Sequence, residues 1–315
     1  MGAAPVAERQ LFPLVPRRRL LGLPFGEQRS SRRGPGSDVV GARPYRPGDP
    51  LGSMDWSATA KLSAARDSDE FVVRSHQADE APRVVLVCDR RPAMSLFGAP
   101  FPWLSKPAAL SAAAQLIVLS AVAARGDVGA LDYAGAAGRH GDPYWLPPGG
   151  RGVMWLIEQR QGAGTGFDAP DDNLEQAIAY LGGMRSGIPP GSFVFILSDF
   201  LAPPPLAAWL DVGAHRWDVV PVVIQDPVWE QSFPDVGSVV VPVRDPAGGG
   251  VRPVRLSARE AAERRAANEE RLRRLLDEFG ALGFDPVVLG TDDPYEIDQL
   301  FMDWAELRGR TRWRR

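Results

Sequence analysis

The stretch Arg83-Val84-Val85-Leu86-Val87-Cys88 does most to decide which fold the sequence predicts. Its first residue is charged and the other five are apolar, and the run lies between Pro82 and Asp89. A strand with one wet face alternates apolar and polar residues, so this pattern indicates a strand buried on both faces. Such strands are typical of parallel sheets that carry helices on both sides. A second run of this kind, at residues 192–197, ends just before Ser198-Asp199.

Predicted strands and helices alternate around these two runs. Further strands are predicted at residues 128–133, 217–224 and 286–289, with an edge or hairpin strand at 238–243. Helices are predicted at residues 107–124, 154–159, 173–181, 257–282 and 294–304. Ser257 and Glu260 have the spacing of a capping box, which marks the start of a helix. This order predicts an α/β fold with a doubly wound, mainly parallel sheet.

Composition along the chain predicts four segments. Residues 1–36 are rich in Arg, Pro, Gly and Ser, and we expect them to form a flexible basic arm. Residues 37–80 hold short extended stretches and many turn residues, which predicts a small β-rich segment. Residues 81–307 are predicted to form the α/β domain, and residues 308–315 a basic tail.

Charge and cysteine content limit the possible partners and the compartment. The net charge of −3 gives no overall field that would attract nucleic acid, and the nine tryptophans do not interleave with a basic stripe. Cys88 is the one cysteine, so no disulfide forms within the chain. No apolar run reaches the roughly 18 residues of a membrane span. We therefore expect a cytoplasmic protein that contacts a membrane at most peripherally, through its basic ends.

Motifs of common enzymes are missing from the sequence. A phosphohydrolase on this kind of sheet has Asp-x-Asp after the first strand, but here Asp89 is followed by Arg90-Arg91. The sequence has no Gly-x-Ser-x-Gly elbow and no phosphate-binding Gly-x-x-x-x-Gly-Lys-Ser loop. One cysteine and three scattered histidines cannot make a structural zinc site. We expect no catalytic residues, although a hydrolase that uses Asp89 and Asp199 remains an alternative.

Two acids follow buried strands, where ligands bind in doubly wound sheets. Asp89 follows the first core strand and Asp199 follows the run at 192–197, while Asp172 at a helix start could come near them. Their oxygens suit Mg²⁺. The same residues could instead cap helices or form turns.

A block near the start of the chain resembles a known family. Gly36-Ser37-Asp38, Arg43-Pro44-Tyr45-Arg46-Pro47-Gly48-Asp49 and Asp55-Trp56-Ser57-Ala58-Thr59-Ala60-Lys61 resemble the hallmark of the domain-of-unknown-function-58 (DUF58) family. The resemblance spans about residues 30–305. The chain departs from the hallmark at Asp38, Gly52 and Lys61, where the family has Glu, Arg and Arg. The matching residues that remain are Arg43, Tyr45, Pro47, Gly48, Asp49, Asp55 and Trp56.

Two interpretations of the matching residues stay open. They could contact a partner directly. They could also form a structural staple, in which Asp55 pairs with Arg43 while Trp56 packs on the sheet.

The family is similar to von Willebrand factor A domains, and this implies a cation site. Those domains hold a divalent cation through Asp-x-Ser-x-Ser after the first strand, a Thr from a later loop and a further Asp. The matching positions here are Asp89, Arg91, Ala93, Asp172 and Asp199, with Thr165 a second choice for the Thr position. Neither Arg91 nor Ala93 offers a hydroxyl. We therefore predict a vestigial site in which the guanidinium of Arg91 replaces the metal, and no cofactor.

The resemblance also implies a function. It predicts a non-catalytic adaptor that pairs with a MoxR-type AAA+ ATPase in a chaperone-like assembly acting on an unknown client protein. A Mg²⁺-dependent ligand-binding module of the von Willebrand factor A type is the alternative within the same fold.

Overall fold

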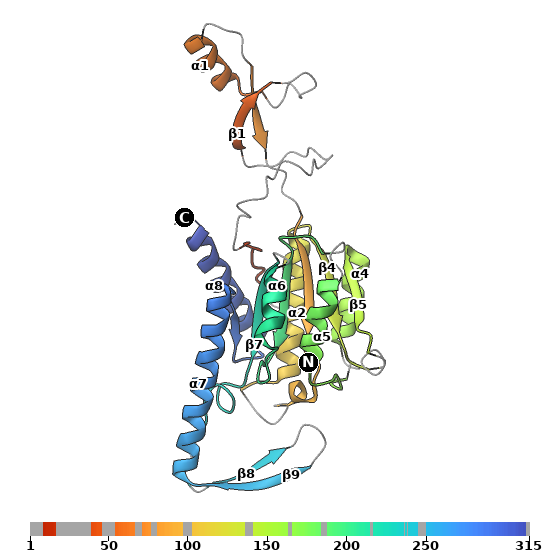
Figure 1. Ribbon diagram of the computed structural model, residues 1–315, viewed down its shortest axis with the longest axis vertical. Helices are drawn as coiled ribbons and strands as arrows, with labels where there is room; N and C mark the ends of the chain where they lie inside the picture. Colours follow the sequence, from red (N-terminus) through yellow and green to blue (C-terminus); the bar gives the residue numbers. More distant parts are fainter. Residues whose placement is uncertain are drawn as a thin grey trace, which may run out of the picture. The chain divides into compact units, whose positions relative to one another are not determined.

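The chain forms two compact units. The computed structural model describes residues 9–16, 39–45, 54–66, 71–76, 81–96, 103–135, 141–162, 166–183, 188–214, 217–235, 237, 239–244 and 250–312. The large unit contains Met1–Leu20 and Pro82–Arg315, and the small unit contains Leu21–Ala81 (Figure 1).

A mainly parallel sheet forms the centre of the large unit, which confirms the predicted α/β fold. Among the described residues it has six strands in the order β10-β7-β6-β3-β4-β5. The strands are β3 (Arg83–Cys88), β4 (Asp127–Asp132), β5 (Tyr144–Gly149), β6 (Phe193–Ser198), β7 (Asp218–Ile224) and β10 (Val287–Leu289). All neighbours are parallel except β4 and β5. The chain runs outward from β3 to β5 and then returns to β6 on the other side of β3, so the topological switch point lies between β3 and β6.

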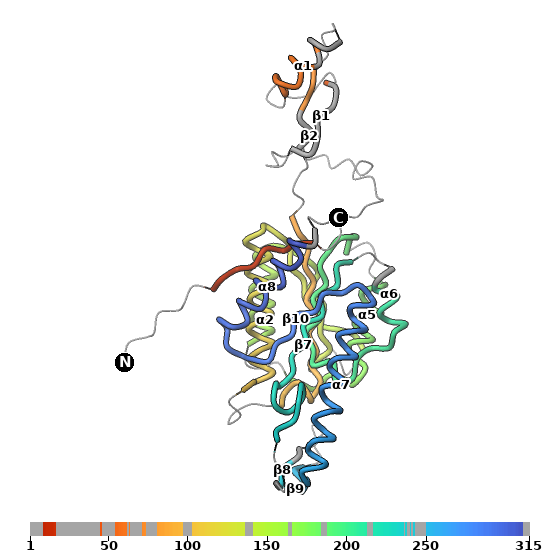
Figure 2. Tube along the Cα trace, turned by 90° about the vertical axis from the view of Figure 1, so that its left-hand side faces the viewer, coloured from red at the N-terminus to blue at the C-terminus, as the bar shows by residue number. Residues whose placement is uncertain are grey.

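Helices cover both faces of this sheet (Figure 2). One face carries α2 (Lys106–Ala123), α4 (Arg151–Gln161) and α8 (Pro294–Arg312), and the other carries α5 (Asn173–Gly183), α6 (Leu206–Ala214) and α7 (Ala258–Leu282). Val84 and Leu86 of β3 point into the first layer, while Val85 and Val87 point into the second. Burial on both faces is the reason that β3 has an unbroken apolar sequence.

Helix α2 corrects the expectation that the chain lacks a long apolar stretch. Its 18 residues have a mean hydropathy of 1.5, so by length and composition it could cross a membrane. Most of the helix is buried, however, and Leu116 and Ile117 are completely inaccessible in the first core layer. The side chain of Ser105 caps its N-terminus by accepting a hydrogen bond from the backbone N–H of Ala108. Most of its apolar surface thus packs within the large unit.

The segment 9–16 is not part of a flexible arm, contrary to the prediction for residues 1–36. Phe12 is 2% exposed and its ring lies 4.8 Å from that of Phe301 and 5.8 Å from that of Trp304. Arg9 forms an ion pair with the buried Asp298 at 2.6 Å. One large aromatic side chain and one ion pair hold this segment on α8, although its composition suggests a loose arm.

The basic tail was predicted to begin at residue 308, but the folded part of the chain extends beyond that residue. Helix α8 continues to Arg312, and Arg308 is 2% exposed. Its guanidinium pairs with Asp218 at 3.0 Å and with Asp285 at 3.1 Å. Arg308 therefore belongs to the folded domain, and residues 313–315 lie outside the described residues.

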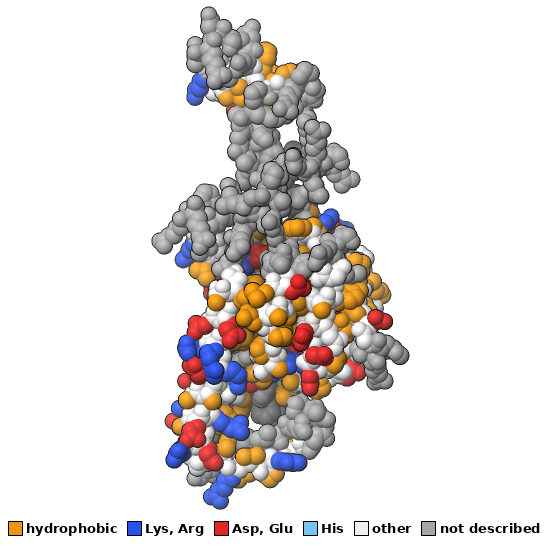
Figure 3. All heavy atoms as spheres, viewed as in Figure 1, with side chains coloured by type: hydrophobic (Ala, Val, Ile, Leu, Met, Phe, Trp, Pro, Cys, Tyr) orange, Lys and Arg blue, Asp and Glu red, His pale blue; other side chains and the backbone are white. Residues whose placement is uncertain are grey.

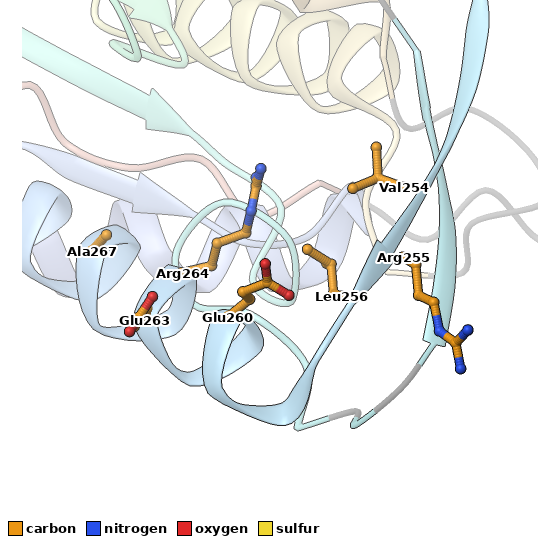
Figure 4. A pocket seen from close by; sticks show the side chains of 7 residues that line it. All are labelled: Val254, Arg255, Leu256, Glu260, Glu263, Arg264 and Ala267. Carbon is orange, nitrogen blue, oxygen red and sulfur yellow. The ribbon is translucent and has the colours of Figure 1, made fainter.

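A hairpin and the long helix α7 extend the large unit on one side. Strands β8 (Val239–Arg244) and β9 (Val251–Leu256) pair in antiparallel fashion, and Ser257 then starts α7 with the predicted capping box. Figure 4 shows the shallow groove between β9 and the start of α7. Its lining mixes apolar side chains with both charge signs: Val254, Arg255, Leu256, Glu260, Glu263, Arg264 and Ala267.

The small unit combines a strand pair with one helix in its described part. Strand β1 (Val39–Pro44) pairs with β2 (Val72–His76) in antiparallel fashion, and α1 (Trp56–Arg66) lies between them in sequence. The sequence predicted a β-rich segment here but not the helix. Asp55 starts α1, because its carboxylate accepts a hydrogen bond from the N–H of Ala58 at 3.0 Å.

Candidate functional site

The two acids singled out by the sequence meet at the carboxyl end of the sheet. Asp89 follows β3 and Asp199 follows β6, and these strands are neighbours. The N–H of Asp89 donates to the carbonyl of Leu197 at 2.9 Å, which continues the strand pairing by one residue. Both carboxylates are fully buried, at 0% exposure. A buried charge is stable only when it is paired, so the partners of these acids determine what the site can do.

Arg91 joins the two carboxylates. Its Nη2 donates to Oδ2 of Asp89 at 2.5 Å and to Oδ1 of Asp199 at 3.0 Å, while its Nε donates to both oxygens of Asp89 at 3.0 Å. Burial alone would lower the pKa of Arg91, but the hydrogen bond and charge of Asp89, together with the charge of Asp199, raise it above its ordinary value. The guanidinium therefore stays charged between the two acids.

Lys106 supplies a second buried cation. It is the first residue of α2, and its Nζ donates to Oδ2 of Asp199 at 2.9 Å and to Oε1 of Glu230 at 2.5 Å. A cation at a helix N-terminus is opposed by the helix dipole. Two carboxylates offset that repulsion, and the lysine side chain is 0% exposed.

Together these five side chains form a row of alternating charges, which we call the buried charge network: Asp89, Arg91, Asp199, Lys106 and Glu230. Three acids face two cations, so one negative charge is in excess when all are ionised. Burial raises the pKa of Glu230 above its ordinary value, against the lowering effect of Lys106. Protonation of Glu230 would make the network neutral.

Neutral donors satisfy the remaining oxygens of the two acids. The hydroxyl of Ser198 donates to Oδ2 of Asp89 at 2.6 Å, and Nδ2 of Asn173 donates to its Oδ1 at 3.2 Å. The N–H of Leu201 donates to Oδ1 of Asp199 at 3.0 Å. Each carboxylate thus has its hydrogen bonds made within the protein.

Asp172 does not join this cluster, contrary to the expectation. It is exposed, and its Oδ1 accepts a hydrogen bond from Gln176 within α5 at 2.8 Å. Asn173 is 1% exposed and takes the inward position instead. The difference of one residue follows from the start of α5, which turns Asn173 toward the sheet and Asp172 toward solvent.

Ala93 lies in a short 3₁₀ helix, Pro92–Ser95, beside the network. It contributes only its backbone carbonyl, which accepts a hydrogen bond from Nζ of Lys106 at 3.5 Å. The structure therefore brings together Asp89, Arg91 and Asp199 with the backbone of Ala93.

A divalent cation does not fit this arrangement. A metal between Asp89 and Asp199 would need their free oxygens, but those oxygens face a guanidinium and an ammonium group. Within the described parts of the chain, no group of three or more His, Cys, Asp or Glu side chains is placed to hold a metal ion. Hydrolysis by these carboxylates has no geometric support either, because both are buried and ion-paired.

The hallmark residues of the small unit are described in part. Pro47, Gly48 and Asp49 lie outside the described residues, and Arg43 is described only through its backbone, which pairs with Val73. Asp55 and Trp56 stand at the start of α1.

The side chain of Trp56 is 62% exposed, whereas the staple interpretation has it packed on the sheet. The pairing of Asp55 with Arg43 in the same interpretation involves a side chain outside the described residues. Tyr45 forms an edge-to-face contact with Phe71 at 6.4 Å.

Sequence reasoning missed Lys106, Glu230, Asn173 and Ser198. Lys106 gave the clearest signal, because it is the only charged residue in the 18 residues of α2. A single charge at the start of an apolar core helix needs a buried partner. Glu230 gave no comparable signal, since an acid in a loop is ordinary.

Comparisons with known proteins agree with the resemblance found in the sequence. A family model described as "Protein of unknown function DUF58" matches residues 41–274. No curated protein matches the chain.

Several solved structures are similar to the chain at low sequence identity. The conserved hypothetical protein BatB of Bacteroides thetaiotaomicron has a TM-score of 0.41 and 14% identity, over 71% of this chain and 99% of that chain. An aerotolerance-related membrane protein of Bacteroides fragilis has a TM-score of 0.40 and 13% identity, over 72% and 99%. The pilus adhesin SpaC of Lactobacillus rhamnosus has a TM-score of 0.38 and 14% identity, over 75% and 31%.

Proposed function

The chain belongs to the DUF58 family, whose model covers residues 41–274, and from this premise we propose that it works by binding a partner and not by catalysis. The buried charge network carries this proposal. Ligands of doubly wound sheets bind at the carboxyl ends of the strands. Here that position is filled by Arg91 and Lys106, which hold Asp89 and Asp199 away from any substrate or metal.

The partner we propose is a MoxR-type AAA+ ATPase, for which the chain acts as an adaptor in a chaperone-like assembly. The family resemblance of the hallmark block is the main support. Trp56 adds physical support, because a large aromatic side chain that is 62% exposed is typical of a binding hot spot. The cap at Asp55 fixes the start of α1, so the indole is presented from an ordered backbone.

Co-purification in the presence of a non-hydrolysable ATP analogue tests this proposal. The full chain is expected to recover a AAA+ ATPase from a lysate of its own organism, identified by mass spectrometry. Trp56→Ala should reduce the recovery strongly, since truncation of a hot-spot tryptophan costs at least about 2 kcal/mol. Trp155→Ala is the matched control, because Trp155 also lies on a helix and is 57% exposed.

Two results would count against the adaptor role. One is recovery of no AAA+ ATPase by the wild-type chain under these conditions. The other is recovery that Trp56→Ala and Trp155→Ala reduce equally, which would remove Trp56 from the interface. The cytoplasmic location and the absence of a cofactor remain predictions, and cell fractionation and metal analysis of the purified chain test them.

A further inference from the structure

Helix α6 consists almost entirely of apolar residues, although one side of it faces solvent. Its sequence, Leu-Ala-Ala-Trp-Leu-Asp-Val-Gly-Ala, has a single charged residue, Asp211. Trp209 and Val212 point inward and are 4% and 2% exposed, and the indole of Trp209 lies 5.6 Å from the ring of Phe279 on α7. A surface helix normally has a polar outer face. In α6 the exposed residues are apolar except for Asp211.

The exposed side carries a row of apolar residues. Leu206 is 62% exposed and Leu210 is 59% exposed, and they lie one helical turn apart on the same side. The exposed residues of the preceding loop and first turn are also apolar, and we call the whole set the α6 stripe: Ala202, Pro203, Pro205, Leu206, Ala207 and Leu210. Single exposed leucines need no explanation, but a continuous apolar patch marks an interaction site. Figure 3 shows apolar side chains gathered over α6.

Acidic residues accompany the α6 stripe. Between residues 162 and 214 the sequence has six acids and one basic residue, Arg185. Five of the six acids are exposed: Asp168, Asp171, Asp172, Glu175 and Asp211. Helices α5, which carries Glu175, and α6, which carries Asp211, are neighbours, and acidic side chains flank the apolar ones in Figure 3.

We propose that the α6 stripe binds a basic amphipathic helix of a partner protein. The two leucines would take the apolar face of that helix, and the acids of α5 and α6 would attract its Lys and Arg side chains. The same acids would repel an anionic membrane surface. This inference rests on the proposal that the chain functions by partner binding, and it adds a second surface, on the large unit, with a defined ligand chemistry.

A synthetic peptide serves as the probe. It has about 18 residues, or five helical turns, with leucines on one face and lysines on the other, and carries a fluorescent label. Fluorescence anisotropy with the full chain is expected to show binding that weakens with added salt. A peptide with glutamates in place of the lysines should not bind. Leu206→Ser/Leu210→Ser should weaken binding by about tenfold or more for each leucine.

Matched controls distinguish binding at the α6 stripe from nonspecific binding elsewhere on the surface. Leu307→Ser removes a leucine of equal exposure, 60%, from α8 and should leave binding unchanged. Glu175→Lys should weaken binding, whereas Glu158→Lys changes the charge of an exposed residue on α4, on the opposite face of the sheet, and should have little effect. These substitutions are at exposed positions, so the fold should tolerate them.

Three outcomes would overturn the inference. The first is peptide binding that Leu206→Ser/Leu210→Ser does not weaken. The second is equal binding of the lysine and glutamate peptides. The third is self-association of the wild-type chain, measured by analytical ultracentrifugation, that the double variant abolishes, since a second copy would then cover the stripe. Recovery of the ATPase is measured separately, so either proposal can fail while the other stands.

Discussion

Replacing Arg91 by methionine tests whether the buried charge network holds the carboxyl end of the sheet together. The substitution keeps much of the side-chain volume and removes the charge. Asp89 then keeps only neutral donors, namely Ser198, Asn173 and the backbone N–H of residue 91, while Asp199 keeps Lys106. Asp89 is therefore the group that becomes an uncompensated buried charge.

The expected loss of unfolding free energy is about 3–5 kcal/mol, the usual result of removing one member of a buried ion pair. The upper part of that range is reasonable here, because Asp89 is 0% exposed and Arg91 donates to both of its oxygens. Asp89→Asn/Arg91→Met removes the charge together with its partner. This double variant should recover most of the loss, since no ionised carboxylate is left unpaired.

Denaturant unfolding followed by circular dichroism measures these differences. Arg259→Met is the control, because Arg259 pairs with Glu263 on the surface of α7 at 87% exposure and should matter little. A loss below about 1 kcal/mol for Arg91→Met would refute the argument, since buried ion pairs cost more to break. So would a double variant no more stable than Arg91→Met alone.

Three further outcomes are expected. The raised pKa of Glu230 means that its stabilising contribution is complete below pH 4.5 and is lost as pH rises through the folded pKa, so the stability of wild type relative to Glu230→Gln should fall over that window in denaturation series. Phe12→Ala should cost about 3–5 kcal/mol in the same assay, whereas Leu11→Ala, at a 39% exposed site, should cost far less. Calorimetric titration with Mg²⁺ should show no micromolar binding; binding that Asp199→Ala abolishes would mean that Arg91 leaves room for a metal.

The sheet could be predicted because the sequences of its central strands are sufficient to identify them as strands. The apolar runs of β3 and β6, which are rich in β-branched and aromatic residues, are typical of strands that are buried on both faces. The same reasoning missed β5 (Tyr144–Gly149) and β9, because neither contains an unbroken apolar run: β5 ends in Pro-Pro-Gly, and two arginines interrupt β9. Strand β5 lies at the edge of the sheet, where a proline removes no necessary hydrogen bond. An edge position is a property of the assembled sheet, and a local stretch of sequence does not reveal it.

The candidate site was predictable to the extent that it follows from position along a strand. Asp89, Arg91 and Asp199 come directly after the buried strands, so their meeting follows from strand order. Lys106 lies 93 residues from Asp199 and 124 from Glu230 in sequence. Its contacts depend on how α2 packs on the sheet. The prediction that Asp172 lies in the cluster was wrong, because the first turn of α5 points Asn173 inward and Asp172 toward solvent.

The positive charge of the network affects whether the carboxyl end of the sheet can bind a metal. A divalent metal between Asp89 and Asp199 would bring a charge of +2, and Arg91 and Lys106 together bring the same charge. A bound metal can keep a coordination position open to a partner's carboxylate. Side-chain cations that already donate to buried acids offer no such position. We therefore propose that the charge at the carboxyl end of the sheet does not depend on metal concentration, and that a partner binds through other surfaces, such as Trp56 or the α6 stripe.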